Sequence, residues 1–283
     1  MTDHVLVWHP KVPDERPGSD DQPRLIGMPT GLVRPARQAL AADQLTAASA
    51  EVMHQALAGL RGLAEAPDGP TVRIPLDHLD EAGKAAVADM LGEGDVWAKV
   101  GLHETYWRVV ESVLPGVWRL EAGTADGLLG EWIEVATVPQ PVVQAAAELS
   151  RTSIDIPRQM PKGAMNAPSL LAELQTRSAN FRPGQPNHVI NFTLLPLTEV
   201  DAEVLTAVLG QIPLVIRSGG YGSTRVFATG LRNVWAVQYI NGLDKVVLDT
   251  LEVGGVPVAV LAAREDFEDS AERLAEILEA FAS

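Results

Sequence analysis

The sequence predicts an α+β fold built as two tandem copies of one unit, in which a helix, a strand and a second helix precede a run of antiparallel strands and a closing helix. An internal repeat recurs with a nearly constant spacing of 117 to 121 residues, which is typical of a duplicated domain. Strand-like segments outnumber helical ones and are separated by hairpin-length gaps, which favours antiparallel pairing over a doubly wound sheet. The matching pairs include Pro75 and Pro196, Leu91 and Leu209, Trp118 and Trp235, Glu134 and Glu252, and Pro139 and Pro257.

In the first copy, apolar residues at helical spacing predict helices over residues 45–63 and 79–91, on either side of a short strand at 71–76. Asp43 is placed to cap the first helix, because its carboxylate can accept from the free N–H groups of the first turn. Pro139 suits the first turn of the closing helix, where a missing N–H is no loss. The strand candidates lie at 96–100, 106–111, 117–121 and 131–137.

In the second copy, Asn166 is expected to cap a helix that runs through Leu174, and a strand is expected at 189–194. Thr198 and Asp201 have the spacing of a capping box for a helix that ends at Leu209. Further strands are expected at 214–217, 225–229, 234–240 and 246–253. The apolar stripe of the last helix consists of Phe267, Ala271, Leu274, Ile277, Leu278 and Phe281.

The breaks between these elements predict four parts of the chain. Residues 1–24 are rich in Pro, Asp and Gly and indicate an irregular lead-in. The first, divergent repeat domain is expected at 25–150 and the second at 167–283. Residues 151–166, with three helix-breaking residues, are interpreted as the linker between them.

Composition excludes several classes of function. A formal net charge of −15 argues against binding to a phosphate backbone, so we expect no nucleic-acid partner. The 283 residues contain no cysteine, which excludes disulfides, thiolate metal sites and cysteine nucleophiles. No apolar stretch approaches the length of about 20 residues that a membrane span needs, so no membrane insertion is expected. The start also lacks the basic and apolar regions of a signal peptide, and we expect a cytoplasmic protein.

The glycine-rich segment at 218–224 is interpreted as a hairpin turn. A phosphate-binding loop needs a helix after it, because the free N–H groups of the helix N-terminus hold the phosphate. Here the next residues form a strand pattern, so the glycines are expected to supply positive φ in a turn.

Polar and aromatic residues around this turn have the composition of a protein-binding hot spot. The first copy retains little of this cluster, which favours a binding role in the second copy. For Trp235 a core position is an equally good interpretation, because Trp118 occupies the same place in the first copy. The candidate partner-binding residues are Arg217, Gly220, Tyr221, Gly222, Arg225, Arg232, Asn233, Trp235, Tyr239 and Asn241.

No pattern in the chain indicates catalysis or a cofactor. The six histidines are scattered, and none has the spacing that pairs two ligands of one metal ion. No Gly-x-Ser-x-Gly elbow occurs, and no nucleophile has a base nearby in the sequence. We therefore expect no enzyme, no metal and no cofactor.

Several separate motifs resemble, in the right order, the conserved region of the HupH/HyaF hydrogenase expression proteins. The resemblance is close over residues 165–283 and reaches the first half only through the internal repeat. Gly219 and Thr224 stand where family members often carry Arg and Cys, so the loop is not expected to act through a thiol. The motifs that carry the resemblance lie at 188–197, 220–222, 231–241, 248–257 and 262–274.

The resemblance implies an accessory chaperone in the maturation of uptake NiFe-hydrogenase. Such a chaperone would bind the iron–sulfur small-subunit precursor before assembly and export, with other maturation proteins as further partners. The alternative is a small-ligand-binding protein or an enzyme that uses the glycine hairpin and a cleft between the copies. A third interpretation, a structural scaffold, predicts no localised hot spot, and the sequence indicates no particular oligomeric state.

Overall fold

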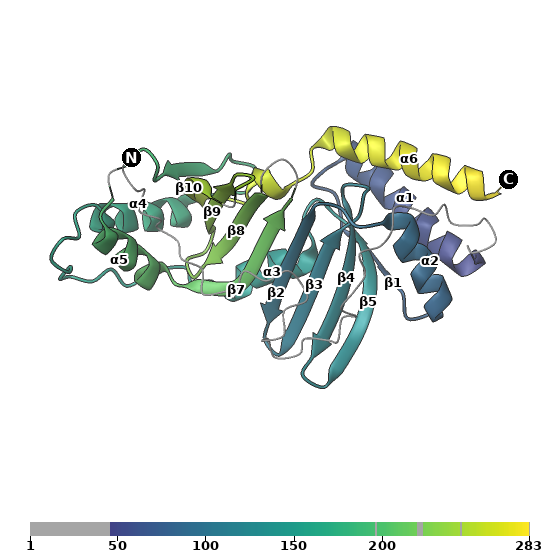
Figure 1. The fold of residues 1–283 in the computed structure, drawn as a ribbon, viewed down its shortest axis with the longest axis horizontal. Helices are drawn as coiled ribbons and strands as arrows, with labels where there is room; N and C mark the ends of the chain where they lie inside the picture. Colours follow the sequence, from purple (N-terminus) through teal and green to yellow (C-terminus); the bar gives the residue numbers. More distant parts are fainter. Residues whose placement is uncertain (1–45, 196, 220–222, 244, 283) are drawn as a thin grey trace. The chain divides into compact units, whose positions relative to one another are not determined.

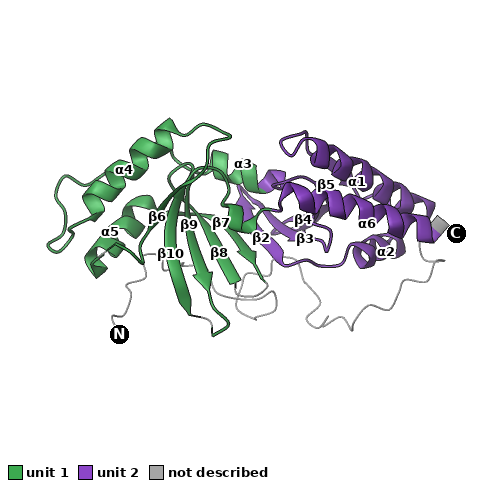
Figure 2. Ribbon diagram, turned by 90° about the horizontal axis from the view of Figure 1, so that it is seen from above, with its two compact units in different colours: residues 1–13, 142–261 green, residues 14–141, 262–283 purple. Residues whose placement is uncertain are grey.

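The computed structural model describes residues 46–195, 197–219, 223–243 and 245–282 (Figure 1). Within them the chain divides into two compact units (Figure 2). Unit 1 contains residues 142–261, and unit 2 contains residues 46–141 and 262–282. Each unit packs helices against an antiparallel sheet, which confirms the expected α+β class.

Unit 2 has a five-stranded sheet in the order β1-β5-β4-β3-β2, in which every neighbouring pair is antiparallel. The first strand of the unit, β1, pairs with the last, β5. The helices α1 and α2, which come before and after β1 in sequence, therefore pack on the sheet. The elements are α1 (Ala47–Glu65), β1 (Val72–Pro75), α2 (Glu81–Leu91), β2 (Val96–Leu102), β3 (Thr105–Glu111), β4 (Val117–Thr124), β5 (Gly127–Val135) and α6 (Arg264–Ala282).

Unit 1 repeats this strand order. Its described strands run β6-β10-β9-β8-β7, again all antiparallel, with the first strand beside the last. The elements are α3 (Gln140–Glu148), whose first two residues precede the unit boundary, α4 (Ala167–Asn180), β6 (His188–Asn191), α5 (Glu199–Leu209), β7 (Gln211–Ser218), β8 (Ser223–Thr229), β9 (Val234–Ile240), β10 (Val246–Val253) and the 3₁₀ turn η2 (Val258–Val260). β6 ends three residues before the expected strand does, because Phe192 begins a turn.

The last helix, α6, belongs to the core of unit 2 and lies along α1 (Figures 1 and 2). The expected apolar stripe is confirmed, since Phe267, Ala271, Leu274 and Leu278 are buried there beside Leu60 of α1. Helix α6 is the last element of the predicted second repeat domain (167–283), but it packs with residues of the first.

The first turn of α1 begins at Thr46, whose hydroxyl accepts from the Ser49 N–H at 3.1 Å. Asp43, the expected cap, lies outside the described residues. The capping box at α5 is confirmed, because the Thr198 hydroxyl accepts from the Asp201 N–H and the Asp201 carboxylate accepts from the Thr198 N–H.

Residues 151–166, interpreted above as a linker, lie inside unit 1 and contribute to its core. Ile154 is buried, and the Arg151 N–H donates to the Gly230 carbonyl at 2.8 Å. The Arg151 guanidinium donates to the carbonyls of Val208 and Leu209 at 3.1 Å each, at the C-terminal end of α5. A cation there satisfies carbonyls that the helix leaves free. Residues 151–166 are therefore a docked segment of unit 1.

Asn166 stands at the N-cap position of α4, as expected, but the capping bonds come from Asp201 of α5. The Asn166 side chain makes no capping bond. One oxygen of the buried Asp201 carboxylate instead accepts from the N–H groups of Met165, Asn166 and Ala167 at 2.8, 2.9 and 2.8 Å. Sequence reasoning missed this because the acceptor stands 34 residues or more from its donors.

The two units share one further feature, a buried corner between their second and third hairpin strands. In unit 2 the Ser112 hydroxyl donates to the Leu114 carbonyl and accepts from the Leu114 N–H. In unit 1 the Thr229 hydroxyl does the same with Leu231. The corner then continues through a residue of positive φ in each unit, Gly116 or Asn233.

Replacing Asp201 by Asn should lower the free energy of unfolding by about 1–3 kcal/mol, because several buried donors lose a charged acceptor. Burial alone would raise the pKa of this carboxyl, but the N–H groups of Ala167, Thr198 and Asn166 outweigh burial and lower the pKa. The stabilisation should thus be complete above the ordinary pKa of 3.8 and be lost as the pH falls through the lower folded value. Urea unfolding of the variant and the unchanged protein measures the difference.

The matched control is Glu199→Gln, which removes an exposed carboxylate from the same helical turn. This control should change the stability by less than about 0.5 kcal/mol. Equal stability of the Asp201→Asn variant and the unchanged protein would contradict the assigned cap.

Candidate partner-binding face

The predicted turn residues Gly220, Tyr221 and Gly222 lie outside the described residues. On either side of them, β7 and β8 bring Arg217 and Arg225 directly opposite each other. The register continues from Arg225 to Gln238 on β9 and from Gln238 to Asp249 on β10. We call these four residues the unit 1 polar row.

The unit 1 polar row lies on the same face of the sheet as an apolar part of the unit 1 core, which is closer to the helices. Val215 and Phe227, two residues along β7 and β8, are also cross-strand partners and belong to the core under α4 and α5. Side chains two residues apart on a strand point to the same face. Arg217 and Arg225 are half-buried, so the row combines two guanidinium groups with a partly dehydrated surface.

Unit 2 has a matching row, which sequence reasoning missed. Lys99, Arg108, Glu121 and Glu131 are cross-strand partners in the same order, 117 or 118 residues before the members of the unit 1 polar row. Arg108 pairs with Glu121 at 2.9 Å, and Lys84 of α2 pairs with Glu131 at 2.6 Å. The first copy therefore keeps the two basic positions of the cluster, as Lys99 and Arg108, but has no tyrosine or asparagine where unit 1 has Tyr239 and Asn241.

The two rows differ in charge at one central position. Glu121, which pairs with Arg108 in unit 2, corresponds to the neutral and buried Gln238 in unit 1. Lys99 and Arg108 stand 118 and 117 residues before Arg217 and Arg225, so the repeat spacing alone would have found them in the sequence. The acids that neutralise them could be found only from the strand register.

Trp235 lies in the core, as the second interpretation of this residue had it. Its side chain is 4% exposed, and its indole N–H donates to the Gly254 carbonyl at 3.3 Å. Trp118 makes the matching bond to the Ala136 carbonyl at 2.8 Å in unit 2. Trp235 therefore cannot belong to an exposed aromatic face of unit 1.

Arg232 and Asn233 lie at the other end of the sheet, in the buried corner between β8 and β9. The Arg232 guanidinium donates to the Ala147 carbonyl at 2.8 Å, and the Arg232 carbonyl accepts from the Ser178 hydroxyl at 2.6 Å. Asn233 has a φ of 58°, and its carbonyl accepts from the Gly254 N–H. These contacts give both residues a structural role, distant from Arg217 and Arg225.

Tyr239 and Asn241 lie near the turn but do not extend the unit 1 polar row. Tyr239 follows Gln238 on β9, so its side chain points to the opposite face. Burial, with a smaller contribution from the charge of Glu252, raises the pKa of Tyr239. The Asn241 side-chain oxygen accepts from the N–H groups of Leu243 and Lys245 and holds the β9–β10 hairpin.

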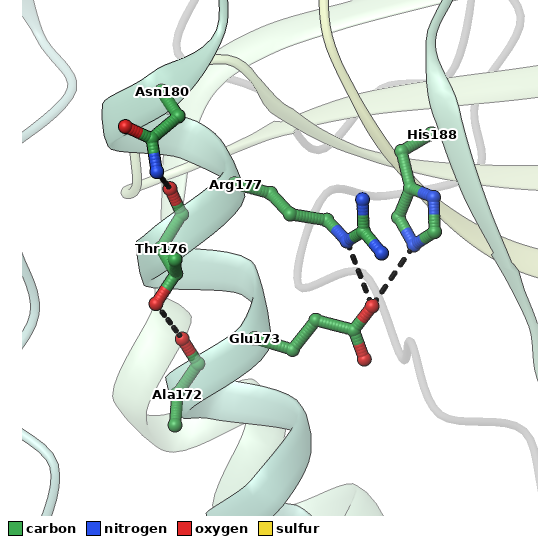
Figure 3. A network of polar contacts seen from close by, with 6 residues as sticks. All are labelled: Ala172, Glu173, Thr176, Arg177, Asn180 and His188. Atoms are coloured by element: carbon green, nitrogen blue, oxygen red, sulfur yellow. Dashed lines mark hydrogen bonds and ion pairs between the residues drawn. The ribbon is translucent and has the colours of Figure 1, made fainter.

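A second polar cluster joins α4 to the edge strand β6 (Figure 3). One Glu173 oxygen accepts from the Arg177 guanidinium at 2.7 Å and lies 3.1 Å from the His188 ring nitrogen. The hydrogen bond from Arg177 lowers the pKa of Glu173, burial raises it, and the charge of Arg177 with the His188 contact leaves the pKa below its ordinary value. All three side chains are exposed by more than a third, so this cluster contributes little to stability.

The described residues offer no metal centre, because nowhere among them do three His, Cys, Asp or Glu side chains gather closely enough to hold an ion. None of the helices in the described part of the chain combines the length and the apolar composition of a membrane span.

The chain resembles known proteins along its whole length. Residues 164–281 match the model of the HupH hydrogenase expression protein, C-terminal conserved region. The hydrogenase expression/formation protein HupH of Rhizobium leguminosarum bv. viciae is 43% identical over 197 residues, 69% of each chain. The corresponding HoxQ of Azotobacter vinelandii is 35% identical over 292 residues, 99% of each chain.

The hydrogenase-1 operon protein HyaF of Escherichia coli K12 is 32% identical over 213 residues, which cover 75% of this chain and 74% of HyaF. The similarity to these relatives therefore includes the first half of the chain. The motifs described in the sequence analysis reached that half only through the internal repeat. By these similarities the chain belongs to the HupH/HyaF family of hydrogenase expression/formation proteins.

Proposed function

We propose that this chain is an accessory chaperone in the maturation of uptake NiFe-hydrogenase, and that it binds the iron–sulfur small-subunit precursor before assembly and export. Family membership along almost the whole chain is the observation that carries the proposal. The relatives are named for hydrogenase expression and formation, which supports a role in maturation. Other maturation proteins are its further proposed partners.

The proposed role is binding, without catalysis. Three of the residues that sequence reasoning singled out, Arg232, Trp235 and Asn241, bond through their side chains to main-chain groups of unit 1 itself. Arg232 donates to a carbonyl of α3, and Asn241 accepts from N–H groups of the β9–β10 hairpin. An enzyme or small-ligand-binding protein remains the alternative, and the experiments below distinguish it from a chaperone.

The client surface is proposed to centre on Arg217 and Arg225. These guanidinium groups share one face, and Gln238 beside them is neutral where unit 2 has a paired Glu121. Guanidinium groups donate to carboxylates and carbonyls of a partner in a fixed geometry. The net charge of −15 on the whole chain would also favour the approach of a basic precursor.

We also propose that the two units arose by duplication of one unit and that the protein works in the cytoplasm. The shared strand order and the Ser112 and Thr229 corners support duplication. A chaperone that acts before export must meet its client in the cytoplasm, which supports the location.

Tagged protein from a hydrogenase-expressing host should co-purify with the small-subunit precursor, identified by mass spectrometry. Recovery should disappear in a strain that lacks the small-subunit gene, because its product is the proposed client. Recovery of the mature, exported small subunit alone would contradict binding before export. Recovery of no hydrogenase subunit from either strain would overturn the chaperone proposal and favour a small ligand.

Replacing Arg217 and Arg225 together by Gln should weaken binding of the isolated precursor by roughly tenfold or more, because both residues carry charge on the proposed client surface. The matched control replaces their unit 2 counterparts, Lys99 and Arg108, by Gln. Titration calorimetry measures both affinities, and thermal unfolding verifies that both variants remain folded.

The control variant should keep the original affinity within about twofold. An unchanged affinity in the folded Arg217 and Arg225 variant would place the client surface elsewhere. Arg232 is unsuitable for this test, because its replacement would also remove the bond to the Ala147 carbonyl.

A further inference from the structure

Helix α6 is attached to unit 2 at the buried corner between β3 and β4. Phe267 in its first turns is 1% exposed, and its ring packs against the α-carbon of Gly116. A Cβ at Gly116 would come within 2.7 Å of that ring, so the contact has no room for a side chain. One helical turn and a half later, the Arg273 guanidinium donates to the Val113 carbonyl at 3.2 Å. The corner is thus the point where the helix is anchored.

A buried carboxylate forms the other side of this anchor. Glu111, the last residue of β3, is 7% exposed, and its side chain accepts from the Gly116 N–H at 3.1 Å. Residue 116 therefore contacts Phe267 through its α-carbon and Glu111 through its N–H. No cation is bonded to the Glu111 carboxylate among the described residues.

The charged groups that act on Glu111 are mainly acidic. Asp266 of α6 and Asp95 before β2 both repel its negative charge. The Asp266 carboxylate accepts from the Ala263 N–H at 2.7 Å, as a cap of the helix. Of the neighbouring cations, Arg273 is bonded to the Val113 carbonyl, while Arg108 and Arg119 lie beside Glu93.

We propose that α6 is a reversible strap on unit 2, and that ionisation of Glu111 at its anchor point loosens it. A protonated Glu111 can stay in the buried corner without repelling Asp266. An ionised Glu111 gains from solvation and from distance to Asp266, and both are available only when α6 and its Phe267 leave the corner. Release uncovers part of the apolar side of α1, which includes Leu60 beside Phe267.

The ionisation of Glu111 in the docked form falls in the physiological pH range. Burial raises the pKa of Glu111 to about 7, against a lowering by the Gly116 N–H and with further raising by Asp266 and Asp95. In the released form the carboxyl should return toward its ordinary pKa of 4.5. The docking of α6 is thus strongest below pH 4.5, the ordinary pKa of the Glu111 carboxyl. It weakens as the pH rises toward about 7, the pKa of Glu111 when α6 is docked, and changes little above that pH. This device does not depend on the identity of the client.

The test is hydrogen exchange of the α6 amides in the full chain, corrected for the intrinsic exchange rate, from about pH 6 to about pH 8. The opening constant of α6 is the equilibrium ratio of its released form to its docked form. It should rise roughly tenfold over this range, because the pKa of Glu111 is near 4.5 in the released form and near 7 in the docked form. In Glu111→Gln the constant should change less than about twofold, because the titrating group is absent. Amides of β4 should stay more protected than those of α6, because the opening is local.

The matched control is Glu265→Gln, which removes an exposed carboxylate from the first turn of α6 and should keep the tenfold rise. Asp95→Asn gives a second variant that leaves Glu111 in place, and its rise should be smaller than that of the unchanged protein. A tenfold rise that persists in folded Glu111→Gln would overturn the proposal. So would an α6 that opens only together with β4 at every pH.

Discussion

Each unit depends on one constraint, that a buried turn in the middle of the sheet must satisfy its own backbone. Leu114 and Leu231 are at most 1% exposed at these corners, where water cannot serve their N–H and C=O groups. A single hydroxyl, from Ser112 or Thr229, accepts from the N–H of that leucine and donates to its carbonyl. Buried polar groups that lack such partners cost roughly 1–3 kcal/mol each. With the turn satisfied, the corner becomes a fixed surface on which other segments dock.

The two corners receive different segments, and much of the difference between the units follows from that. In unit 2 the corner anchors α6 through Phe267 and Arg273. In unit 1 the main chain of Arg151 bonds to Gly230 and Arg232 on both sides of the corner, and Ser178 of α4 bonds to it as well. A docked chain segment thus takes in unit 1 the place that a helix takes in unit 2. The residue of unit 1 that corresponds to Glu111 is the uncharged Ala228, so the proposed sensitivity to pH belongs to the unit 2 corner.

Local signals in the sequence predicted most of the elements, and long-range contacts account for the errors. The Thr198 capping box and the apolar stripe of α6 were correct because each depends on residues within a few turns of helix. The cap of α4 by Asp201 and the docking of residue 151 depend on bonds across 34 to 79 residues, which no local pattern shows. At the candidate site, Arg217 and Arg225 were found by composition. Their charged counterparts, and the structural roles of Arg232 and Trp235, required the strand register and the burial of each side chain.

The proposed client is the small-subunit precursor, held before the hydrogenase assembles. Native mass spectrometry of the purified chain, mixed with equal amounts of the small-subunit and large-subunit precursors, tests this proposal most directly. The expected result is a complex that contains this chain and the small-subunit precursor, with no complex between this chain and the large subunit alone. A complex with the large subunit alone, or free chain beside a folded small-subunit precursor, would contradict the proposal.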